Sequence, residues 1–407
     1  MKNNRTFLEK LLDGTEVEWK TIAEISNKVS SGGTPTTSNN NYYENGNIPW
    51  LRTQEVDFKE IWNTDLKITE EGLNNSSAKW IPKNCVIVAM YGATVGKIAI
   101  NKIPLTTNQA CANIEVNPEI THYRYVFHYL MSKYEYIKSL GSGSQTNINS
   151  QIVKKIRIPI PPLSVQTEIV KILDALTALT SELTSELTSE LILRRKQYEY
   201  YREKLLSEEE LIKLGATAEN LGDVTSISSG GTPSTKEPAY WVGGNIPWIK
   251  SESCKNKLID EIKHHITEVG LQNSNAKLLS PNTTLMAMVG ATIFKTAFLP
   301  FEATTNQNIA AIKSKNELSI TDKFIFYYLT NMYDFFISKL SGYNMVNLSQ
   351  IKNIKILLPP LEEQQRIVSI LDKFEALTNS ITEGLPLAIE QSQKRYEYYR
   401  ELLLNFS

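Results

Sequence analysis

Two segments of the chain have the apolar spacing of long amphipathic helices. Apolar residues recur at intervals of three and four over residues 164–206 and again over residues 362–404. This spacing places a single apolar stripe along an α-helix. A helix over residues 164–206 would be about 60 Å long at roughly 1.5 Å per residue. Because one apolar face on so long a helix needs a partner, we expect the two helices to pair side by side and antiparallel.

The stripes also indicate which side chains should meet across this helix pair. The candidates are Leu173, Leu176, Leu183, Ile370, Leu371 and Phe374. Gly384 and Pro386 interrupt the second segment and should kink its helix. Residues 180–191 of the first segment consist of Thr-Ser-Glu-Leu repeated three times. One repeat is slightly more than a helical turn, so removing it would shorten the helix by about 6 Å and nearly keep the stripe. The tract is either an adjustable ruler or a slipped low-complexity helix without a purpose.

The segments outside the two long helices contain short apolar runs. Runs at 86–90, 97–100 and 354–358 are bounded by glycine and proline and predict strands. Residues 121–130 and 321–329 predict short helices, so the fold class is α+β. The expected organisation is an N-terminal helical segment, a globular domain, a long-helix region, a second globular domain and a second long-helix region. Their boundaries are 1–14, 15–160, 161–210, 211–358 and 359–407.

The order of elements repeats because the chain is an internal duplication. Ser31-Gly-Gly-Thr-Pro35 recurs as Ser229-Gly-Gly-Thr-Pro233, and Gly46-Asn-Ile-Pro-Trp50 recurs as Gly244-Asn-Ile-Pro-Trp248, both with an offset of 198 residues. The same offset relates further pairs: Thr106–Gln109 and Thr304–Gln307, Pro161–Leu163 and Pro359–Leu361, Ile172–Asp174 and Ile370–Asp372, and Tyr198–Glu203 and Tyr396–Glu401. A covalent pseudo-dimer has pseudo-two-fold symmetry, which suits a ligand with two half-sites such as duplex DNA. Residues 5–12 resemble the tails of the two long helices, which predicts a quasi-circular fold with the chain ends close together.

Composition narrows the class of protein. Hydrophobic residues make up 41% and charged residues 21%, as in ordinary globular proteins, and no apolar run is long enough to span a membrane. Cys85, Cys111 and Cys254 are too few and too scattered for a disulfide framework, so we expect buried thiols in a reducing, cytoplasmic compartment. The net charge is −1, but residues 1–160 carry 18 basic against 15 acidic side chains, and residues 211–358 carry 14 against 11. This excess is small for a protein that would bind DNA phosphates alone, so either the positive charge is clustered on one face or a partner supplies most of the phosphate contacts.

Motifs for catalysis, cofactors and metals are not found in the sequence. Gly92–Lys97 is one residue short of a phosphate loop, and its second copy, Gly290–Lys295, lacks the second glycine. The four histidines do not have the spacing of metal ligands. We therefore expect no catalysis, no cofactor and no metal in this chain, and we interpret the glycine segments as strand-to-strand turns.

The sequence contains more residues suited to binding DNA than residues suited to catalysis. The glycine turns offer hydroxyls and backbone N–H groups that suit phosphates, while basic side chains near them can reach a duplex. Candidate DNA-binding residues in the first copy are Ser31, Gly32, Gly33, Thr34, Arg52, Lys59, Lys67 and Lys97. Those in the second copy are Ser229, Gly230, Gly231, Thr232, Lys250, Lys257, Lys263 and Lys295. The alternative is that the shared turns are scaffold and the charges solvated surface, because domains that read different sequences must differ at their readers. The Ile-Pro-Trp segments are expected in the core.

Several repeated motifs of this chain together resemble those of the specificity (S) subunit of type I restriction-modification enzymes. They are the two Ser-Gly-Gly-Thr-Pro and Gly-Asn-Ile-Pro-Trp blocks, the Pro-Pro-Leu segments and the Tyr-Glu-Tyr-Tyr-Arg helix ends. The tetrapeptide tract and the opening Leu8–Gly14 are most similar to the type IC branch. The resemblance implies two target recognition domains that each read one half of a bipartite sequence in double-stranded DNA. It implies that the long helices form an antiparallel coiled coil and dock two methyltransferase (M) subunits, which bind S-adenosylmethionine and methylate adenine.

The resemblance further implies restriction (R) subunits that add ATP-driven translocation and cleavage, and a spacer between the half-sites whose length is set by the number of tetrapeptide repeats. Three alternatives remain at this point. The chain could be the specificity module of a methyltransferase-only or type IIG-like system, a recombining specificity cassette, or a scaffold of two modules that does not bind DNA.

Overall fold

The protein is described here by a computed structural model that covers residues 7–141, 147–339, 345–379 and 384–406. The described residues form two compact units, one from the ranges 1–186 and 389–407 and the other from 187–388. We call them unit 1 and unit 2. Each contains β-sheets covered by helices, which confirms the α+β class, and each contains part of the long helix α6 (Leu163–Leu205).

Unit 1 is built around a five-stranded sheet with the order β2-β10-β7-β8-β4. Its pairs are antiparallel except β4 with β8, which is parallel. A four-stranded sheet (β5-β3-β9-β6) and a two-stranded ribbon (β1-β11) complete it. The strands are β1 Glu18–Thr21, β2 Ser26–Ser31, β3 Ile48–Leu51, β4 Glu60–Ile61, β5 Leu66–Ile68, β6 Trp80–Ile81, β7 Val86–Ala89, β8 Ile98–Asn101, β9 Leu105–Thr107, β10 Cys111–Val116 and β11 Arg157–Ile160. The short helices are α1 Phe7–Leu12, α2 Glu70–Asn74, α3 Tyr123–Ser132, α4 Tyr134–Ser139 and α5 Ser150–Lys155.

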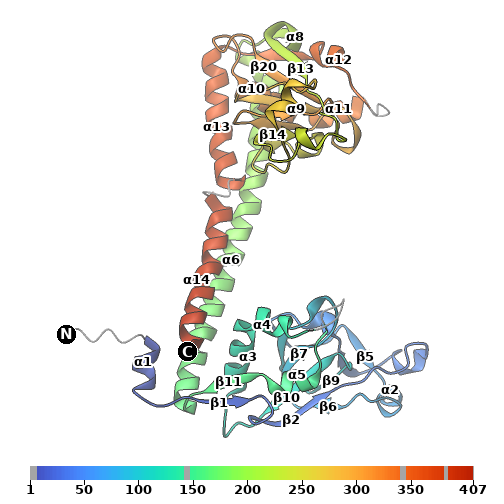
Figure 1. Ribbon diagram of the computed structural model, residues 1–407, viewed down its shortest axis with the longest axis vertical. Coiled ribbons are helices and arrows are strands. Elements are labelled where there is room, and N and C mark those ends of the chain that lie inside the picture. The colour runs from blue at the N-terminus through green and yellow to red at the C-terminus, as the bar shows by residue number, and fades with distance from the viewer. Residues whose placement is uncertain (1–6, 142–146, 340–344, 380–383, 407) are drawn as a thin grey trace, which may run out of the picture. The chain divides into compact units, whose positions relative to one another are not determined.

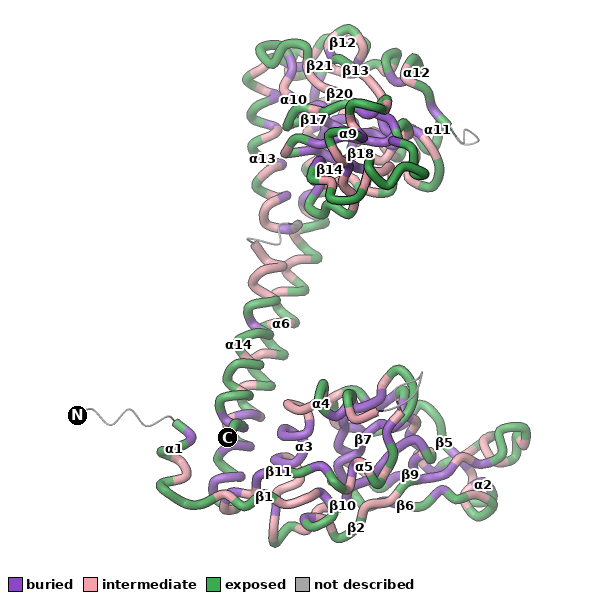
Figure 2. Tube along the Cα trace, viewed as in Figure 1, coloured by how far each residue is buried: buried purple, intermediate pink, exposed green. Residues whose placement is uncertain are grey.

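The core of unit 1 lies on both faces of the large sheet. Val86 and Val88 of β7 share one apolar cluster with Leu130 of α3, whereas Ile87 and Ala89 belong to a second cluster on the opposite face. Because side chains alternate along a strand, a run such as Val-Ile-Val-Ala can only be buried throughout when both faces are covered. Figure 2 shows this burial concentrated on the central strands. The strands and helices predicted for these segments are therefore confirmed.

Unit 2 repeats the same plan. Its five-stranded sheet has the order β13-β20-β17-β18-β15, accompanied by a three-stranded sheet (β16-β14-β19) and a ribbon (β12-β21). The strands are β12 Thr217–Asn220, β13 Thr225–Ser229, β14 Ile246–Ile249, β15 Lys257–Leu258, β16 His265–Ile266, β17 Thr283–Ala287, β18 Thr296–Leu299, β19 Thr304–Thr305, β20 Ile309–Ser314 and β21 Lys355–Leu358. The helices are α7 Glu208–Lys213, α8 Leu221–Val224, α9 Glu268–Gln272, α10 Asp322–Asn331, α11 Tyr333–Lys339 and α12 Leu348–Lys352.

The long-helix predictions are confirmed for the first segment and corrected for the second. The helix α6 is continuous over 43 residues. The second segment is two helices, α13 Leu361–Asn379 and α14 Gly384–Leu404, rather than one kinked helix. Gly384 has φ +81°, and a Cβ there would lie 2.6 Å from the carbonyl oxygen of Ala376, so only glycine fits this start of α14. Pro386 lies in the first turn of α14, where its missing N–H costs no helical hydrogen bond.

Within each unit, α6 packs against one of these two helices (Figure 1). In unit 1 the hydroxyl of Thr177 donates a hydrogen bond of 3.1 Å to the hydroxyl of Tyr396 on α14. In unit 2 the ring of Phe374 on α13 stacks on Tyr201 of α6, with ring centroids 5.5 Å apart. The predicted partners of α6 are therefore correct within each unit.

The six predicted pairing residues have different surroundings. Leu173 and Leu371 are fully buried in the core clusters of their units, which also include α3 and α10. Phe374 lies between the two helices, and Leu176 and Ile370 are partly buried. The side chain of Leu183 is 43% exposed. The middle of α6 thus buries less apolar surface than its ends.

The N-terminal helix meets the end of α14 in unit 1. Leu8 of α1 shares the core cluster with Leu403 and Leu404, as a quasi-circular fold requires. However, α1 corresponds to α7 and not to the tail of α6. Each is a six-residue helix followed by a glycine of positive φ and the first strand of its unit. The similarity of residues 5–12 to the helix tails was therefore a misleading alignment.

Candidate nucleic-acid interface

The Gly-Gly-Thr-Pro turns are held tightly against the rest of their domains. A Cβ on Gly32 would lie 1.8 Å from the carbonyl oxygen of Thr107, and the equivalent distance for Gly230 and Thr305 is 2.0 Å. The indole N–H of Trp50 donates a 3.0 Å hydrogen bond to the carbonyl of Gly33. These glycines allow backbone segments to approach where no side chain fits.

Unit 2 reproduces the same bond from Trp248 to Gly231, also at 3.0 Å. Both tryptophans are buried, which confirms the prediction that Ile-Pro-Trp lies in the core. The recurrence of the two motifs therefore follows from packing: each supplies half of one contact.

Hydroxyl groups remain accessible at the edge of the same turns. Ser31 and Thr232 are exposed, and Ser229 and Thr34 are partly exposed. The hydroxyl of Thr232 donates to the side-chain oxygen of Gln307 at 2.6 Å. Thr34 makes the corresponding bond to Gln109. The Thr-Asn-Gln segments thus tie each turn to a neighbouring strand, and DNA contact by the turn hydroxyls stays a prediction.

The basic candidates of unit 1 surround a closed turn. Glu55 accepts the backbone N–H of Arg52 at 3.2 Å and that of Asp65 at 2.8 Å, so its carboxylate joins the two ends of the loop between β3 and β5. Lys97 forms an ion pair of 2.6 Å with Asp57. Lys59 and Lys67 are exposed on β4 and β5 or beside them. DNA contact by these side chains stays a prediction.

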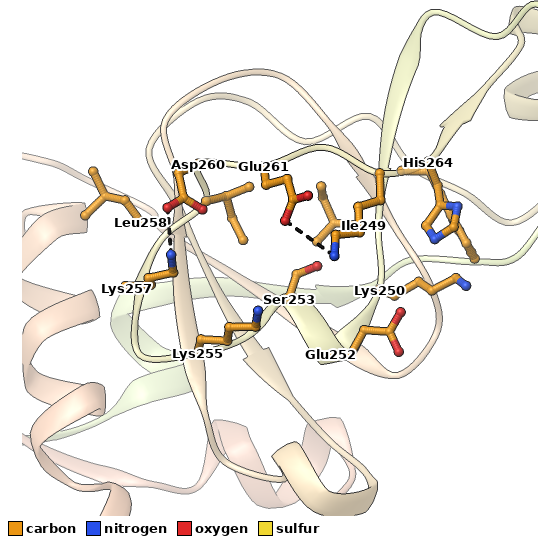
Figure 3. A pocket seen from close by; sticks show the side chains of 13 residues that line it. Ile249, Lys250, Glu252, Ser253, Lys255, Lys257, Leu258, Asp260, Glu261 and His264 are labelled. Atoms are coloured by element: carbon orange, nitrogen blue, oxygen red, sulfur yellow. Dashed lines mark hydrogen bonds and ion pairs between the residues drawn. The ribbon is translucent and has the colours of Figure 1, made fainter. Parts of the chain in front are cut away.

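The same place in unit 2 is an open pocket of about 290 Å³. It is lined by the lysines at positions 250, 255, 257 and 263 together with Glu252, Ser253, Asp260, Glu261 and His264, among other residues. Lys257 pairs with Asp260 at 2.6 Å and Lys263 with Glu261 at 3.4 Å. In Figure 3, Lys255, Ser253 and Glu261 point toward one another across the pocket.

Lys250 of this pocket and Lys295 lie over aromatic rings. The Nζ atom of Lys250 is 5.7 Å from the ring centroid of Trp248, and that of Lys295 is 5.9 Å from the ring of Tyr333. Among the described residues neither lysine, nor Lys255, has an ion pair. These cations are therefore available to an external acceptor.

Sequence reasoning missed the residues that fix the long helices to the domains. Gln166, fully buried at the start of α6, accepts from the hydroxyl of Thr121 and from the backbone N–H of His122, both at 2.9 Å. Its amide donates to the carbonyls of Ile120 and Pro161.

In unit 2, Gln364 at the start of α13 makes the matching bonds to Thr321, Ser319 and Pro359. The recurrence of Pro-Pro-Leu-x-x-Gln could have indicated this role. A side chain that satisfies several backbone groups at the start of a helix fixes its position and direction.

A second set of polar contacts, which we call the clasp, joins Asp174 of α6 to α3. Arg124 donates to both carboxylate oxygens of Asp174, and the ring of the buried His128 lies 2.7 Å from it. Burial alone would raise the pKa of Asp174, but the hydrogen bonds from His128 and Arg124 outweigh it and lower that pKa below its ordinary value. Arg124 also contacts Glu60.

The clasp recurs in unit 2 with different chemistry. Asp372 of α13 pairs with Lys323 at 2.9 Å and accepts a hydrogen bond of 2.5 Å from the hydroxyl of Tyr327. The Ile-Leu-Asp motif thus carries a carboxylate that holds each long helix to its domain. The ring that contacts this carboxylate changes from histidine in unit 1 to tyrosine in unit 2.

Metal and thiol chemistry find no support in the described part of the chain. No group of three or more histidine, cysteine or acidic side chains there could hold a metal ion. The three cysteines are free and buried, and burial raises the pKa of Cys85 and Cys254 to about 12. Gly92–Thr94 and Gly290–Thr292 are short 3-10 turns between strands, as expected. Among the described helices none is long and apolar enough to cross a bilayer.

The long helices expose aromatic side chains toward their ends. Tyr200 and Tyr201 of α6 are 57% and 40% exposed, and Tyr398 and Tyr399 of α14 are 60% and 44% exposed. Isolated exposed apolar residues are ordinary, but large aromatic side chains at matching positions of two copies indicate a contact surface.

Comparison with protein families decides the class of this chain. The family model described as "Type I restriction modification DNA specificity domain" matches residues 15–192 and again 217–391. The chain belongs to this family. Its two matches correspond to the two copies of the internal duplication, and the role of the family, DNA specificity in type I restriction-modification systems, is the role of this chain.

Individual relatives agree over the full length. A chain of Haemophilus influenzae named "Putative type I restriction enzyme specificity subunit S.HindORF215P" is 41% identical over 100% of both chains. The specificity subunit of the EcoR124I/EcoR124II enzyme of Escherichia coli is 33% identical over 98% of this chain and 97% of its own. A solved structure titled as the basis of complex assembly and conformational transition of the type I R-M system has a TM-score of 0.63 at 18% identity. It covers 96% of this chain and 98% of its own, and it supports the fold.

Proposed function

We propose that this specificity subunit reads a bipartite DNA target, one half with each domain, and that it recruits two methyltransferase subunits through its long helices. The observation that carries the proposal is the duplication: the same domain occurs twice, with identical scaffold turns and different side chains in the loop between β3 and β5 or between β14 and β16. Two equal frameworks with unequal loops are what a protein needs to recognise two different sequences.

The residues that support the fold and the residues proposed to contact DNA bases lie in different segments of the chain. The fold depends on the glycines of both turns, which are Gly32, Gly33, Gly230 and Gly231. We therefore assign contacts with DNA phosphates to their backbone only where the neighbouring hydroxyls are exposed. Base readout is assigned to the loops. Their candidates are the side chains that differ in chemistry or surroundings between the units: Arg52, Lys59 and Lys67 in unit 1, and Lys250, Lys257 and Lys263 in unit 2. Lys97 and Lys295 follow the adjacent turns and suit phosphate contacts.

The exposed tyrosines of the long helices are the proposed docking surface for the methyltransferase subunits. Tyrosine is enriched at protein interfaces because it offers a large apolar ring with a polar tip. The surface occurs once on α6 and once on α14, which fits two copies of one partner. The partner would also supply S-adenosylmethionine binding and a share of the phosphate contacts, which agrees with the modest basic excess of each domain.

The chain itself is proposed to lack catalysis. Methyl transfer and DNA cleavage would come from the methyltransferase and restriction subunits of the complete complex. Its three buried, free cysteines fit the reducing cytoplasm in which such a complex meets chromosomal DNA.

Domain exchange tests the proposal directly. Residues 15–160 are replaced by the equivalent segment of another specificity subunit, and adenine methylation is mapped across the genome of a host that carries the complex. One half of the methylated motif should change and the other should stay. A change in both halves, or methylation without a bipartite motif, would refute independent reading by two domains.

Docking is tested by substitution of Tyr200 and Tyr398 with alanine. The double variant should lose co-purification with the methyltransferase subunit, whereas Tyr136→Ala, which removes a similarly exposed tyrosine on α4, should retain it. Unchanged co-purification of the double variant would place the docking surface elsewhere. The purified chain without partners should transfer no methyl group from labelled S-adenosylmethionine, and transfer by it would refute the non-catalytic assignment.

A further inference from the structure

We propose that the lysine-lined pocket of unit 2 is the site at which this domain recognises a guanine, with Lys255 as the main donor. The inference deepens the proposed function and rests on it, because it assumes that unit 2 reads one half of the target. It assigns a base and a side chain to that reading.

The pocket exists because one carboxylate of unit 1 has no counterpart in unit 2. Glu55 lies at the position equivalent to Ser253, given the constant offset of 198 residues. In unit 1 the Glu55 carboxylate spans the loop and accepts two backbone N–H groups, those of Arg52 and Asp65. The serine side chain is too short for this bridge. The loop of unit 2 is left open there, and the pocket of about 290 Å³ lies between its two sides.

The charge at this place changes from neutral in unit 1 to positive in unit 2. Lys97 of unit 1 is neutralised by Asp57 at 2.6 Å. The equivalents of these two residues in unit 2 are Lys295 and Lys255, so an ion pair is replaced by two cations. Among the described residues no acidic side chain pairs with either of them. Two lysines that form no ion pair among the described residues favour an external acceptor, and in a DNA-reading domain that acceptor belongs to the nucleic acid.

The side chains around Lys255 distinguish a base from a phosphate. Lys257 and Lys263 are already paired with Asp260 and Glu261, so their charge is largely compensated, which disfavours a phosphate site. Glu252 is exposed and lines the same pocket. Guanine presents two acceptors, O6 and N7, in the major groove, and its partner cytosine presents an amino donor. A lysine donor and a carboxylate acceptor that line one pocket therefore match both halves of a G·C pair.

Unit 1 should read a different pattern at the equivalent position. Its loop is closed by Glu55, and the place of Lys255 is taken by Asp57, which is engaged with Lys97. The same framework thus presents a lysine-lined pocket in one copy and a bridged loop with a neutral ion pair in the other. A difference of this kind is what two domains with different half-sites require.

The test uses the complete chain in complex with its methyltransferase partner and duplexes that contain the motif mapped in the host. Each guanine of the half-site read by unit 2 is replaced in turn by 7-deazaguanine, which keeps base pairing but lacks the N7 acceptor. For the wild-type complex, one replacement should weaken binding by roughly 5- to 150-fold, the range of a good base contact. The Lys255→Met complex, which has no donor at this position, should bind the natural duplex more weakly and show no further loss with 7-deazaguanine.

Two additional variants make the result specific. Ser253→Glu restores the carboxylate found in unit 1 and should close the pocket, with the same loss of guanine dependence. Lys213→Gln removes a charge from unit 2 on α7, far along the chain from the pocket, and should leave the guanine dependence unchanged. Methylation that still requires the half-site of unit 1 would show that the variants remain folded.

Three outcomes would overturn the inference while leaving the proposed function intact. They are a unit 2 half-site without any G·C pair, a Lys255→Met complex that keeps its full dependence on N7, and an equal loss of affinity for all duplexes, which would indicate a phosphate contact. A wild-type complex without any bipartite selectivity would instead refute the proposed function itself.

Discussion

Deleting one tetrapeptide from α6 should shorten the spacer between the two half-sites of the DNA target. The deletion removes Thr188–Leu191, the last of the three Thr-Ser-Glu-Leu repeats, which lies within the continuous helix. The structure indicates that the local contacts survive it. Glu190 forms a 2.7 Å ion pair with Arg194 one turn later, and after the deletion Glu186 stands four residues before the same arginine.

The size of the effect follows from helix geometry. Four residues correspond to about 6 Å of helix length and to a residual rotation of about 40°. One base-pair step is about 3.4 Å, and a turn of 10–10.5 base pairs implies about 35° per step. The helices α13 and α14 keep their length and oppose the shortening, so the realised shift should be near one base pair. The predicted motif keeps both half-sites and has a spacer shorter by one.

Genome-wide mapping of adenine methylation measures the spacer directly. A matched control is a chain in which Thr188–Leu191 is replaced by four alanines, which retains helix length and should retain the spacer. Methylation with the original spacer, or with altered bases in either half-site, would refute the ruler. The repeat would then be a product of slippage that the helix tolerates.

Three further predictions concern the joints between helices and domains. Gln364→Leu should lower the free energy of unfolding of unit 2 by about 1–3 kcal/mol, because buried backbone groups lose their partners, whereas Leu at the exposed neighbour Gln365 should have little effect in the same denaturant titration. The lowered pKa of Asp174 means that its contribution is present above the ordinary carboxyl pKa and is lost as pH falls through the native value, so the difference in Tm between wild type and Asp174→Asn should shrink below about pH 4. Phe374→Ala should cost about 1–2 kcal/mol, since it removes the stacking on Tyr201, and an unchanged Tm would argue against packing between α6 and α13.

The sequence predicted the regular elements well, for a physical reason. A helix such as α6 depends on a periodicity that is visible in the chain, and the buried strand β7 depends on a short apolar run between turn residues. The break between α13 and α14 was less predictable. Gly384 and Pro386 marked its place, but a kink and a complete interruption have the same sequence signal, and the choice depends on the carbonyl groups that approach Gly384.

The site was predicted only in part. The internal repeat drew attention to the glycine turns, yet repetition mainly identifies scaffold, and the bond from Trp50 to Gly33 shows why. The pocket of unit 2 depends on a missing side chain, Ser253 in place of Glu55, and no motif search detects an absence. Gln166 and Asp174 could be found as repeated polar residues, but Thr121, which bonds Gln166, and Arg124 of α3, which bonds Asp174, lie more than forty residues away in sequence.

Unit 1 combines segments from both ends of the chain, and this has a consequence for synthesis on the ribosome. Its core needs Leu403 and Leu404, which are buried beside residues of the first domain, whereas unit 2 is complete once residue 388 has emerged. The domain translated first is therefore finished last. Until the end of α14 arrives, the nascent chain carries an uncovered apolar patch, a natural substrate for chaperones. Premature termination would leave the core of the early domain without the cover that Leu403 and Leu404 provide.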